Sequence, residues 1–149
     1  MKKNRGVTLI ELIIAISIMS IVLLIPTLKG NIILRYKERK ELKEFKNDLN
    51  YARNKAVVES TRYSVMLRKK DNYYIVFKHI TSTTKKIVKS KEFVNGIKIK
   101  TTNIEDHEVI FNYSGAPEIA GTIYLENKKG KQVRLTITPA TGKVNIYFD

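Results

Sequence analysis

The hydrophobic and polar positions divide the chain into three stretches with different periods. Residues 7–28 are almost continuously apolar. A helix rises about 1.5 Å per residue and the hydrocarbon layer is about 30 Å thick, so roughly 20 apolar residues suffice for a membrane span. From Gly30 to Ser60, apolar residues return every three or four positions, which predicts an amphipathic helix. After Ser60, apolar and polar residues alternate, which predicts strands.

The amphipathic stretch predicts one buried helix face. The apolar residues of this face are Leu42, Phe45, Leu49, Ala52 and Ala56. Charged residues, Glu41 and Asp48 among them, fill the other positions, as on a helix that rests on a sheet. If it continued the first helix without a break, the whole would be roughly 80 Å long. Pro26 and Gly30 favour a kink between the two stretches, because proline removes a backbone donor and glycine loosens the chain.

The alternating part predicts an antiparallel sheet structure. A turn at residues 70–72 separates the first two predicted strands, and turns at Asn95-Gly96, residues 115–117, Lys129-Gly130 and Thr141-Gly142 separate later ones. The predicted strands are residues 62–68, 73–78, 85–89, 97–101, 108–113, 122–126, 132–138 and 143–148. The predicted fold class is therefore α+β, with a long N-terminal helix, transmembrane and then amphipathic, packed on a C-terminal antiparallel β-rich domain.

Length and composition limit the classes of protein that fit. The chain has 149 residues, of which 43% are hydrophobic and 28% are charged. This length suits one domain with an attached element, since domains usually have about 100 to 150 residues. The apolar content is too high for a disordered chain. The chain has no cysteine, which excludes disulfides, thiolate metal sites and cysteine nucleophiles.

The apolar stretch follows a basic leader and carries one acid. Residues 1–5 contain three basic side chains, Gly6 follows, and Glu11 is the only charged residue in the apolar stretch. A carboxylate inside a bilayer costs a few kcal/mol unless a cation or protonation neutralises it. Within this helix the only nearby cation would be a new amino terminus, made by cleavage between Gly6 and Val7.

The stretch Gly6-Val7-Thr8-Leu9-Ile10-Glu11-Leu12 resembles the class III leader of type IV pilins and type II secretion pseudopilins. In that family a membrane-embedded prepilin peptidase cleaves after the glycine and N-methylates the new first residue. The resemblance therefore implies cleavage after Gly6 and methylation of Val7, where the family more often has phenylalanine. It also implies that Glu11 pairs with the N-terminal amine of a neighbouring subunit in a helical filament.

The resemblance further implies an organisation and a set of partners. Residues 1–6 would be the leader peptide, residues 7–28 the transmembrane and filament-core helix, residues 29–60 its amphipathic continuation, and residues 61–149 the β-rich globular domain. The N-terminus would lie in the cytoplasm and the globular domain outside the inner membrane. Prepilin peptidase, sibling pilins, an assembly platform protein and a cytoplasmic ATPase would be the partners, and no cofactor is implied.

The β-rich part is similar to one pilin subclass in particular. The segments 111–115, 121–125, 135–137 and 141–144 resemble the GspH/FimT subclass of minor pseudopilins, including its ComGD-like members from competence pili. Glycine turns between alternating strands also occur in many other β domains, so these segments are less specific than the leader.

Two other interpretations of the N-terminal stretch fit less well. A secretory signal peptide is disfavoured, because residues 25–30 lack a small-x-small cleavage site and Glu11 is out of place in one. A membrane anchor of an unrelated single-span protein would make Gly6 and Glu11 coincidences. The charge rule for orientation is ambiguous, because basic residues lie on both sides of the span; the cytoplasmic N-terminus follows from the resemblance.

The sequence contains no residue set that predicts catalysis or a metal site. His79 and His107 lie in separate segments, and we expect both at the surface or at a strand edge. Glu105, Asp106 and Glu108 stand side by side near a strand entrance, whereas calcium loops close several oxygen ligands around one point. Phosphate-binding glycine loops and nucleophile-elbow motifs do not occur. We therefore predict no enzyme activity and no metal.

The charge balance raises the question of an anionic partner. The formal net charge is +14, and loss of the three leader charges would leave +11. Exposed lysines neutralise phosphates without reading sequence, so a DNA-binding receptor of a competence pilus is the alternative function. Lysine outnumbers arginine, which weakens this case because bidentate phosphate contacts favour arginine. The candidate DNA-binding residues are Lys85, Lys86, Lys128, Lys129, Lys131 and Arg134.

Overall fold

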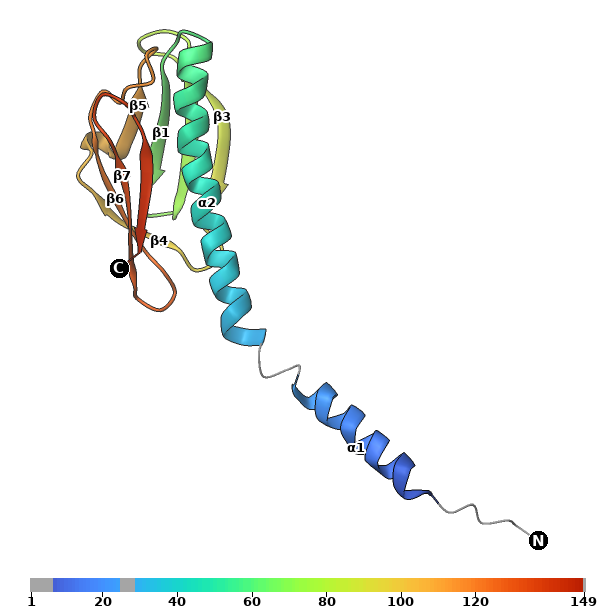
Figure 1. Cartoon of the computed structure of the whole chain (residues 1–149). Helices are drawn as coiled ribbons and strands as arrows, with labels where there is room; N and C mark the ends of the chain where they lie inside the picture. The colour runs from blue at the N-terminus through green and yellow to red at the C-terminus, as the bar shows by residue number, and fades with distance from the viewer. Residues whose placement is uncertain (1–6, 25–28, 149) are drawn as a thin grey trace. The chain divides into compact units, whose positions relative to one another are not determined.

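The computed structural model describes residues 7–24 and 29–148. The chain divides into two units, Met1–Tyr36 and Lys37–Asp149. Helix α1 (Leu9–Leu24) lies in the first unit, and helix α2 (Lys29–Val58) begins there and continues through the second (Figure 1). The predicted kink at Pro26 lies outside the described residues, and Gly30 lies in the first turn of α2.

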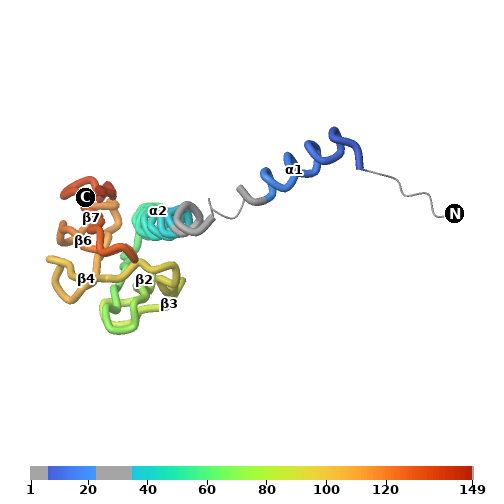
Figure 2. The backbone as a smooth tube through the Cα atoms, turned by 90° about the horizontal axis from the view of Figure 1, so that it is seen from below, coloured from blue at the N-terminus to red at the C-terminus, as the bar shows by residue number. Residues whose placement is uncertain are grey.

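The second unit holds two four-stranded antiparallel sheets. The first sheet has the order β3-β2-β1-β5 and the second has the order β4-β6-β7-β8. In Figure 2 the strands β4, β6 and β7 lie to one side of α2, and β2 and β3 lie below it. The strands are β1 (Tyr63–Arg68), β2 (Tyr73–His79), β3 (Lys85–Glu92), β4 (Lys98–Thr102), β5 (Glu108–Phe111), β6 (Gly121–Glu126), β7 (Gln132–Ile137) and β8 (Val144–Phe148), with the short helix η2 (Glu105–His107) before β5.

All eight predicted strands are confirmed, and the α+β class with them. The largest differences are at two C-terminal ends. Strand β3 continues to Glu92 because it pairs with β2 along its whole length. Strand β5 ends at Phe111 because Asn112 turns away: its backbone N–H donates to the carbonyl of Ala116, and its side-chain oxygen accepts from Ser114 N–H at 2.9 Å.

The core forms where the predicted face of α2 meets both sheets. Every residue of the apolar stripe from Leu42 to Ala56 is at most 2% exposed, which confirms the predicted packing face. The rings of Phe45, Tyr74 and Phe93 contact one another, with centroids 4.7 to 5.4 Å apart. The second sheet contributes buried aliphatic side chains such as Ile123 and Leu135. Burial of this apolar surface is the main stabilising contribution to the domain.

Two predicted turn glycines bring distant loops against α2. Gly115 has φ +81° and Gly142 has φ +62°, and a Cβ on Gly142 would lie 2.3 Å from the carbonyl oxygen of Gly115. The same oxygen accepts a hydrogen bond from Arg53 Nε at 3.3 Å. Glycine is required at both positions, because a side chain would be strained by its backbone angle and would displace this contact.

The end of α2 is fastened to the first sheet by Glu59. Its carboxylate accepts from Lys78 at 2.7 Å, from the Tyr63 hydroxyl at 2.7 Å and from Lys55 at 3.0 Å. These three donors, Lys78 first, lower the pKa of Glu59 to about 2. The ionised form is therefore favoured by folding, since the pKa of a glutamate in an unfolded chain is about 4.3.

We predict a pH dependence of stability that is specific to Glu59. A carboxyl whose pKa is depressed in the folded state stabilises the fold above its unfolded pKa, and this contribution is lost as the pH falls through its folded pKa. The difference in unfolding free energy between the wild type and Glu59→Gln should be constant above pH of about 5 and should shrink towards pH about 2. Urea unfolding at several pH values measures this difference; a difference that does not change with pH would contradict the assignment.

Candidate functional site

Helix α1 is apolar on all of its faces. The large aliphatic side chains of residues 9–22 are more than half exposed within the chain, and they lie on all sides of the helix. A helix that is hydrophobic all round is stable only when other apolar groups cover it, either lipid or neighbouring helices. The hydroxyls of Ser17 and Ser20 donate to the carbonyls of Ile13 and Ile16, both at 2.8 Å, so they do not present unpaired polar groups to such surroundings.

Within residues 7–24 and 29–148, no helix is both long enough and apolar enough to cross a membrane.

Glu11 closes the first turn of α1 with Thr8. Oε2 of Glu11 accepts from the backbone N–H and from the hydroxyl of Thr8, both at 2.9 Å, and Thr8 Oγ1 accepts from Glu11 N–H at 3.4 Å. This reciprocal pair is a capping box, which satisfies backbone donors at a helix N-terminus. This pair was not predicted, although the spacing Thr-x-x-Glu just before an apolar run is the signal for it.

The capping pair fixes where the carboxylate lies. It holds the Glu11 carboxylate against Thr8, which is the residue after Val7. Cleavage after Gly6 would make the amine of Val7 the new N-terminus. Both bonds from Thr8 reach Oε2, so within the described residues Oε1 is left for a further donor. Gly6, where cleavage is predicted, lies outside the described residues.

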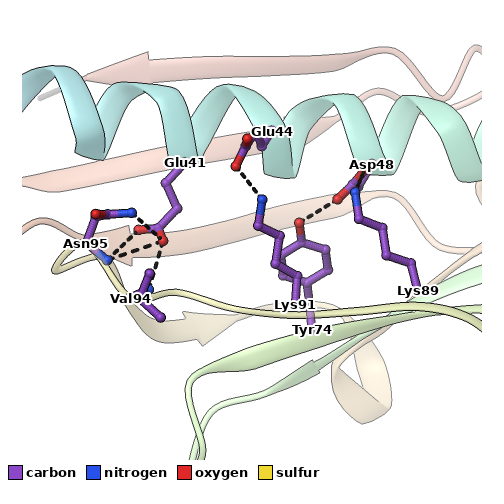
Figure 3. Close-up of polar contacts among 8 residues, drawn as sticks. All are labelled: Glu41, Glu44, Asp48, Tyr74, Lys89, Lys91, Val94 and Asn95. Atoms are coloured by element: carbon purple, nitrogen blue, oxygen red, sulfur yellow. Dashed lines mark hydrogen bonds and ion pairs between the residues drawn. The ribbon is translucent and has the colours of Figure 1, made fainter.

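A row of acids on α2 connects the helix to the first sheet and its loops (Figure 3). The carboxylate of Glu41 accepts from the backbone N–H of Val94 at 2.8 Å and from that of Asn95 at 3.2 Å, and also from the Asn95 side chain at 3.2 Å. Glu41 is only 4% exposed. It therefore holds the turn between β3 and β4 against α2.

Further along the same side, two more acids contact the first sheet (Figure 3). Glu44 pairs with Lys91 of β3, which lowers the pKa of Glu44. Asp48 accepts from the Tyr74 hydroxyl at 2.6 Å and pairs with Lys89 at 2.7 Å. Burial and this hydrogen bond to Asp48 raise the pKa of Tyr74. These contacts fix the edge strand β3 to the helix.

The positions of two of these acids differ from the prediction. Glu41 and Asp48 were expected on the outer, charged positions of the helix, yet both are buried. Their burial is tolerated because each carboxylate has at least two donors, which offset the loss of hydration. The acids follow Glu38 at steps of three or four residues and lie next to the apolar stripe; this spacing was the signal for their role.

His79 was expected at the surface or at a strand edge, and it is not at the surface. His79 lies at the end of β2 and is 7% exposed, and its Nε2 is 3.0 Å from the hydroxyl of Ser64. Its Nδ1 is buried without a hydrogen-bond partner among the described residues. Burial, and then the charge of Lys85, lower the pKa of His79, so it is neutral at pH 7. His107, in contrast, is exposed as expected.

The candidate DNA-binding residues do not form one surface. Lys85 lies at the start of β3 and is half-buried, because its ammonium pairs with both oxygens of Glu108 at 2.7 Å; Lys86 next to it is exposed. Lys128, on the hairpin between β6 and β7, lies beyond the other end of β3. Its Cβ is against Gly96, in the turn that follows this strand. A strand rises about 3.3 Å per residue, so the two groups are roughly 20 Å apart.

The second lysine group lies on the hairpin between β6 and β7. Lys128, Lys129 and Lys131 are exposed there. Arg134 lies on β7, and its guanidinium is 5.9 Å from the centre of the Tyr147 ring, so it belongs to the sheet surface and not to the hairpin tip. The hairpin lysines are therefore the part of the predicted set that gathers exposed cations on one loop, and Lys86 is exposed at a separate site.

Comparison with known proteins supports the resemblance both at the N-terminal leader and in the fold of the rest of the chain. Residues 1–25 match the family described as the prokaryotic N-terminal methylation motif. No curated protein sequence matches the chain. Among solved structures, the minor pseudopilin EpsH from the type 2 secretion system of Vibrio cholerae is similar, with a TM-score of 0.62 and 10% sequence identity over 75% of this chain and 97% of that chain.

The type IV minor pilin FimU of Pseudomonas aeruginosa (strain PAO1) is similar as well. In one crystal form the TM-score is 0.59, with 14% identity over 77% of this chain and 90% of that chain. A second crystal form gives a TM-score of 0.55 and 16% identity. The chain thus has the fold of minor pilins and pseudopilins and carries the N-terminal methylation motif. The resemblance indicated by the leader is confirmed.

Proposed function

We propose that this chain is a minor pilin or pseudopilin that prepilin peptidase cleaves after Gly6 and methylates on Val7. The observation that supports this most strongly is the combination of the methylation motif at residues 1–25 with a pilin-like fold in the rest of the chain. Each part alone is weaker, since the motif covers a short segment and the structural likeness comes with low sequence identity. Their order along the chain is that of a filament subunit.

The mechanism of assembly follows from α1 and Glu11. Residues 7–28 hold the subunit in the cytoplasmic membrane, with the N-terminus inside and Lys37–Asp149 outside. The all-apolar α1 then packs with the equivalent helices of sibling pilins, so that van der Waals contacts hold the filament together. Glu11 pairs with the N-terminal amine of a neighbouring subunit, and this pair selects the register. A platform protein and a cytoplasmic ATPase supply the machinery and the energy; this subunit's role is structural and it has no catalytic step.

The filament is a type II secretion pseudopilus, a type IV pilus or a competence pilus. We assign the chain to the GspH/FimT subclass of minor pseudopilins. The test is co-fractionation in a host that carries the assembly machinery. The mature chain should appear in filaments sheared from cells and should be absent from that fraction when the peptidase gene is deleted. Detection of the uncleaved chain in filaments of the deletion strain would contradict the proposal.

The alternative function, a DNA-binding receptor of a competence filament, now depends on the hairpin. Lys85 is engaged by Glu108, whereas Lys128, Lys129 and Lys131 are exposed on a protruding turn. That exposure is the observation in its favour. Reversal of these three charges should then abolish DNA retardation at moderate salt and leave filament incorporation intact; retained retardation would reject the alternative.

A further inference from the structure

Three segments meet at the end of the domain where α2 enters it. Glu38 Oε1 of α2 accepts from the backbone N–H of Lys128 at 3.3 Å, so the β6–β7 hairpin lies beside the helix. One turn further on, Glu41 holds the turn at Val94 and Asn95. In Figure 1 this hairpin is the loop at the lower end of the two sheets. The hairpin and the first turns of α2 beyond Tyr36 therefore share one end of the globular unit.

Hydrogen bonds fix the backbone of the hairpin tip that carries the lysines. The Asn127 side chain accepts from the backbone N–H of Lys129 at 3.0 Å and of Lys131 at 2.9 Å. Gly130, with φ +76°, completes the turn, and its N–H donates to the carbonyl of Asn127 at 3.0 Å. These bonds fix the backbone of the tip, so its three exposed lysines are carried on a defined loop: Lys129 and Lys131 at the tip, and Lys128 with its stem over Gly96.

The helix contributes further cations to the same end. Lys37, Arg39 and Lys40 are exposed on α2. The two acids interleaved with them, Glu38 and Glu41, are buried and accept bonds from backbone N–H groups, and within the described residues neither forms an ion pair with these cations.

The acid next to the hairpin is engaged as well, because Glu126 pairs with Lys100 at 2.8 Å. The result is a surface of six exposed cations from two elements, which we call the basic end: Lys37, Arg39, Lys40, Lys128, Lys129 and Lys131.

The position of the basic end along the chain favours a lipid surface as its partner. Only residues 29–36 separate it from the apolar stretch 7–28. Eight residues span about 12 Å as a helix and at most about 28 Å when extended, so the basic end remains within reach of the headgroups of a membrane that holds residues 7–28. Lysine suits this partner, because it attracts phosphates as a mobile point charge without a fixed bidentate geometry.

We propose that the basic end binds the phosphate headgroups of anionic phospholipids while the subunit is anchored in the membrane, before it enters a filament. This inference relies on the proposed function for the anchor at residues 7–28. The contact orients the globular unit on the bilayer, and extraction into the filament breaks it. Each lysine or arginine near an anionic surface strengthens adsorption by about fivefold, so loss of two lysines should weaken the docked state about 25-fold.

The test uses the full chain in vesicles and exploits the absence of cysteine. Gln132→Cys places a single fluorophore beside the hairpin, and Ser82→Cys places one at the opposite end of the first sheet; both positions are exposed. Energy transfer to a headgroup-labelled lipid is measured in vesicles of phosphatidylcholine alone and in vesicles that also contain phosphatidylglycerol. We expect transfer from residue 132 to rise with phosphatidylglycerol and to fall again at high salt, because salt screens exposed charges. Transfer from residue 82 should stay low.

A matched pair of variants separates the basic end from net charge. Lys129→Gln/Lys131→Gln should abolish the increase, whereas Lys86→Gln/Lys143→Gln removes the same charge from exposed sites elsewhere and should preserve it. Equal loss in both variants, or no response to phosphatidylglycerol, overturns the inference. Loss of DNA retardation in Lys129→Gln/Lys131→Gln with unchanged lipid transfer also overturns it and assigns the surface to nucleic acid.

Flotation distinguishes this failure from failure of the proposed function. A chain that floats with phosphatidylcholine vesicles but shows no lipid-dependent transfer is anchored as proposed, and only the inference fails. A chain that does not float with either vesicle lacks the anchor, and both the proposed function and the inference fail.

Discussion

Replacing Glu11 with leucine will remove the chain from the filament fraction. If Glu11 pairs with the amine of a neighbouring subunit inside an apolar bundle, its loss leaves that amine buried without a partner, which costs several kcal/mol. The expected result is mature protein that is processed normally, remains in the membrane and is at least tenfold depleted from sheared filaments, since about 1.4 kcal/mol already corresponds to a factor of ten. An immunoblot of membrane and filament fractions measures the ratio.

The capping pair with Thr8 provides the controls for this prediction. Glu11→Gln keeps the acceptor of the capping box but removes the charge. Thr8→Ala removes the cap and keeps the charge. If the charge pair drives assembly, Glu11→Gln should fail as Glu11→Leu does, and Thr8→Ala should assemble. The reverse pattern would show that Glu11 matters only for the start of α1.

Replacing Phe45 with alanine will destabilise the globular unit by about 3–5 kcal/mol. Phe45 is fully buried at the centre of the aromatic group with Tyr74 and Phe93, where α2 meets the first sheet. Truncation removes its transfer free energy and leaves a cavity that the fixed helix cannot close, because Glu41 and Asp48 hold α2 in place on either side. Urea unfolding of the detergent-solubilised chain, followed by circular dichroism, measures the loss.

Tyr51→Ala is the matched control for this substitution. Tyr51 is an aromatic residue on the same helix, but it is 39% exposed and lies outside the core. Its removal should change the unfolding free energy by well under half of the Phe45 effect, since surface substitutions usually cost about 0.5 kcal/mol. Similar losses for the two variants would mean that the packing face of α2 is assigned wrongly.

The elements of the fold could be predicted from the sequence, because each depends on local patterns. The alternation in residues 73–78 and the stripe from Leu42 to Ala56 follow from the periods of a strand and a helix. The division into two sheets could not be predicted. Strand β1 pairs with β5, and β4 pairs with β6, across long stretches of chain, and no local signal specifies such partners.

The burial of single polar side chains could not be predicted as the helices and strands could, and the reason is physical. Glu41 and Asp48 were placed on the outer positions of the helix, and His79 at the surface or a strand edge, because charged and polar side chains usually remain hydrated. Their burial depends on hydrogen-bond partners that come from distant segments, such as Asn95 for Glu41, Tyr74 for Asp48 and Ser64 for His79. Only the fold reveals those partners. The Thr8–Glu11 pair, in contrast, is local, and its spacing was readable from the start.

The central claim is that the chain is a processed prepilin, and its N-terminus tests this most directly. Mass spectrometry of the membrane-extracted protein, from cells with an active prepilin peptidase, should find a first residue Val7 that carries an N-methyl group. An intact Met1, or a chain that begins near Gly30 as after signal-peptide removal, would contradict the account.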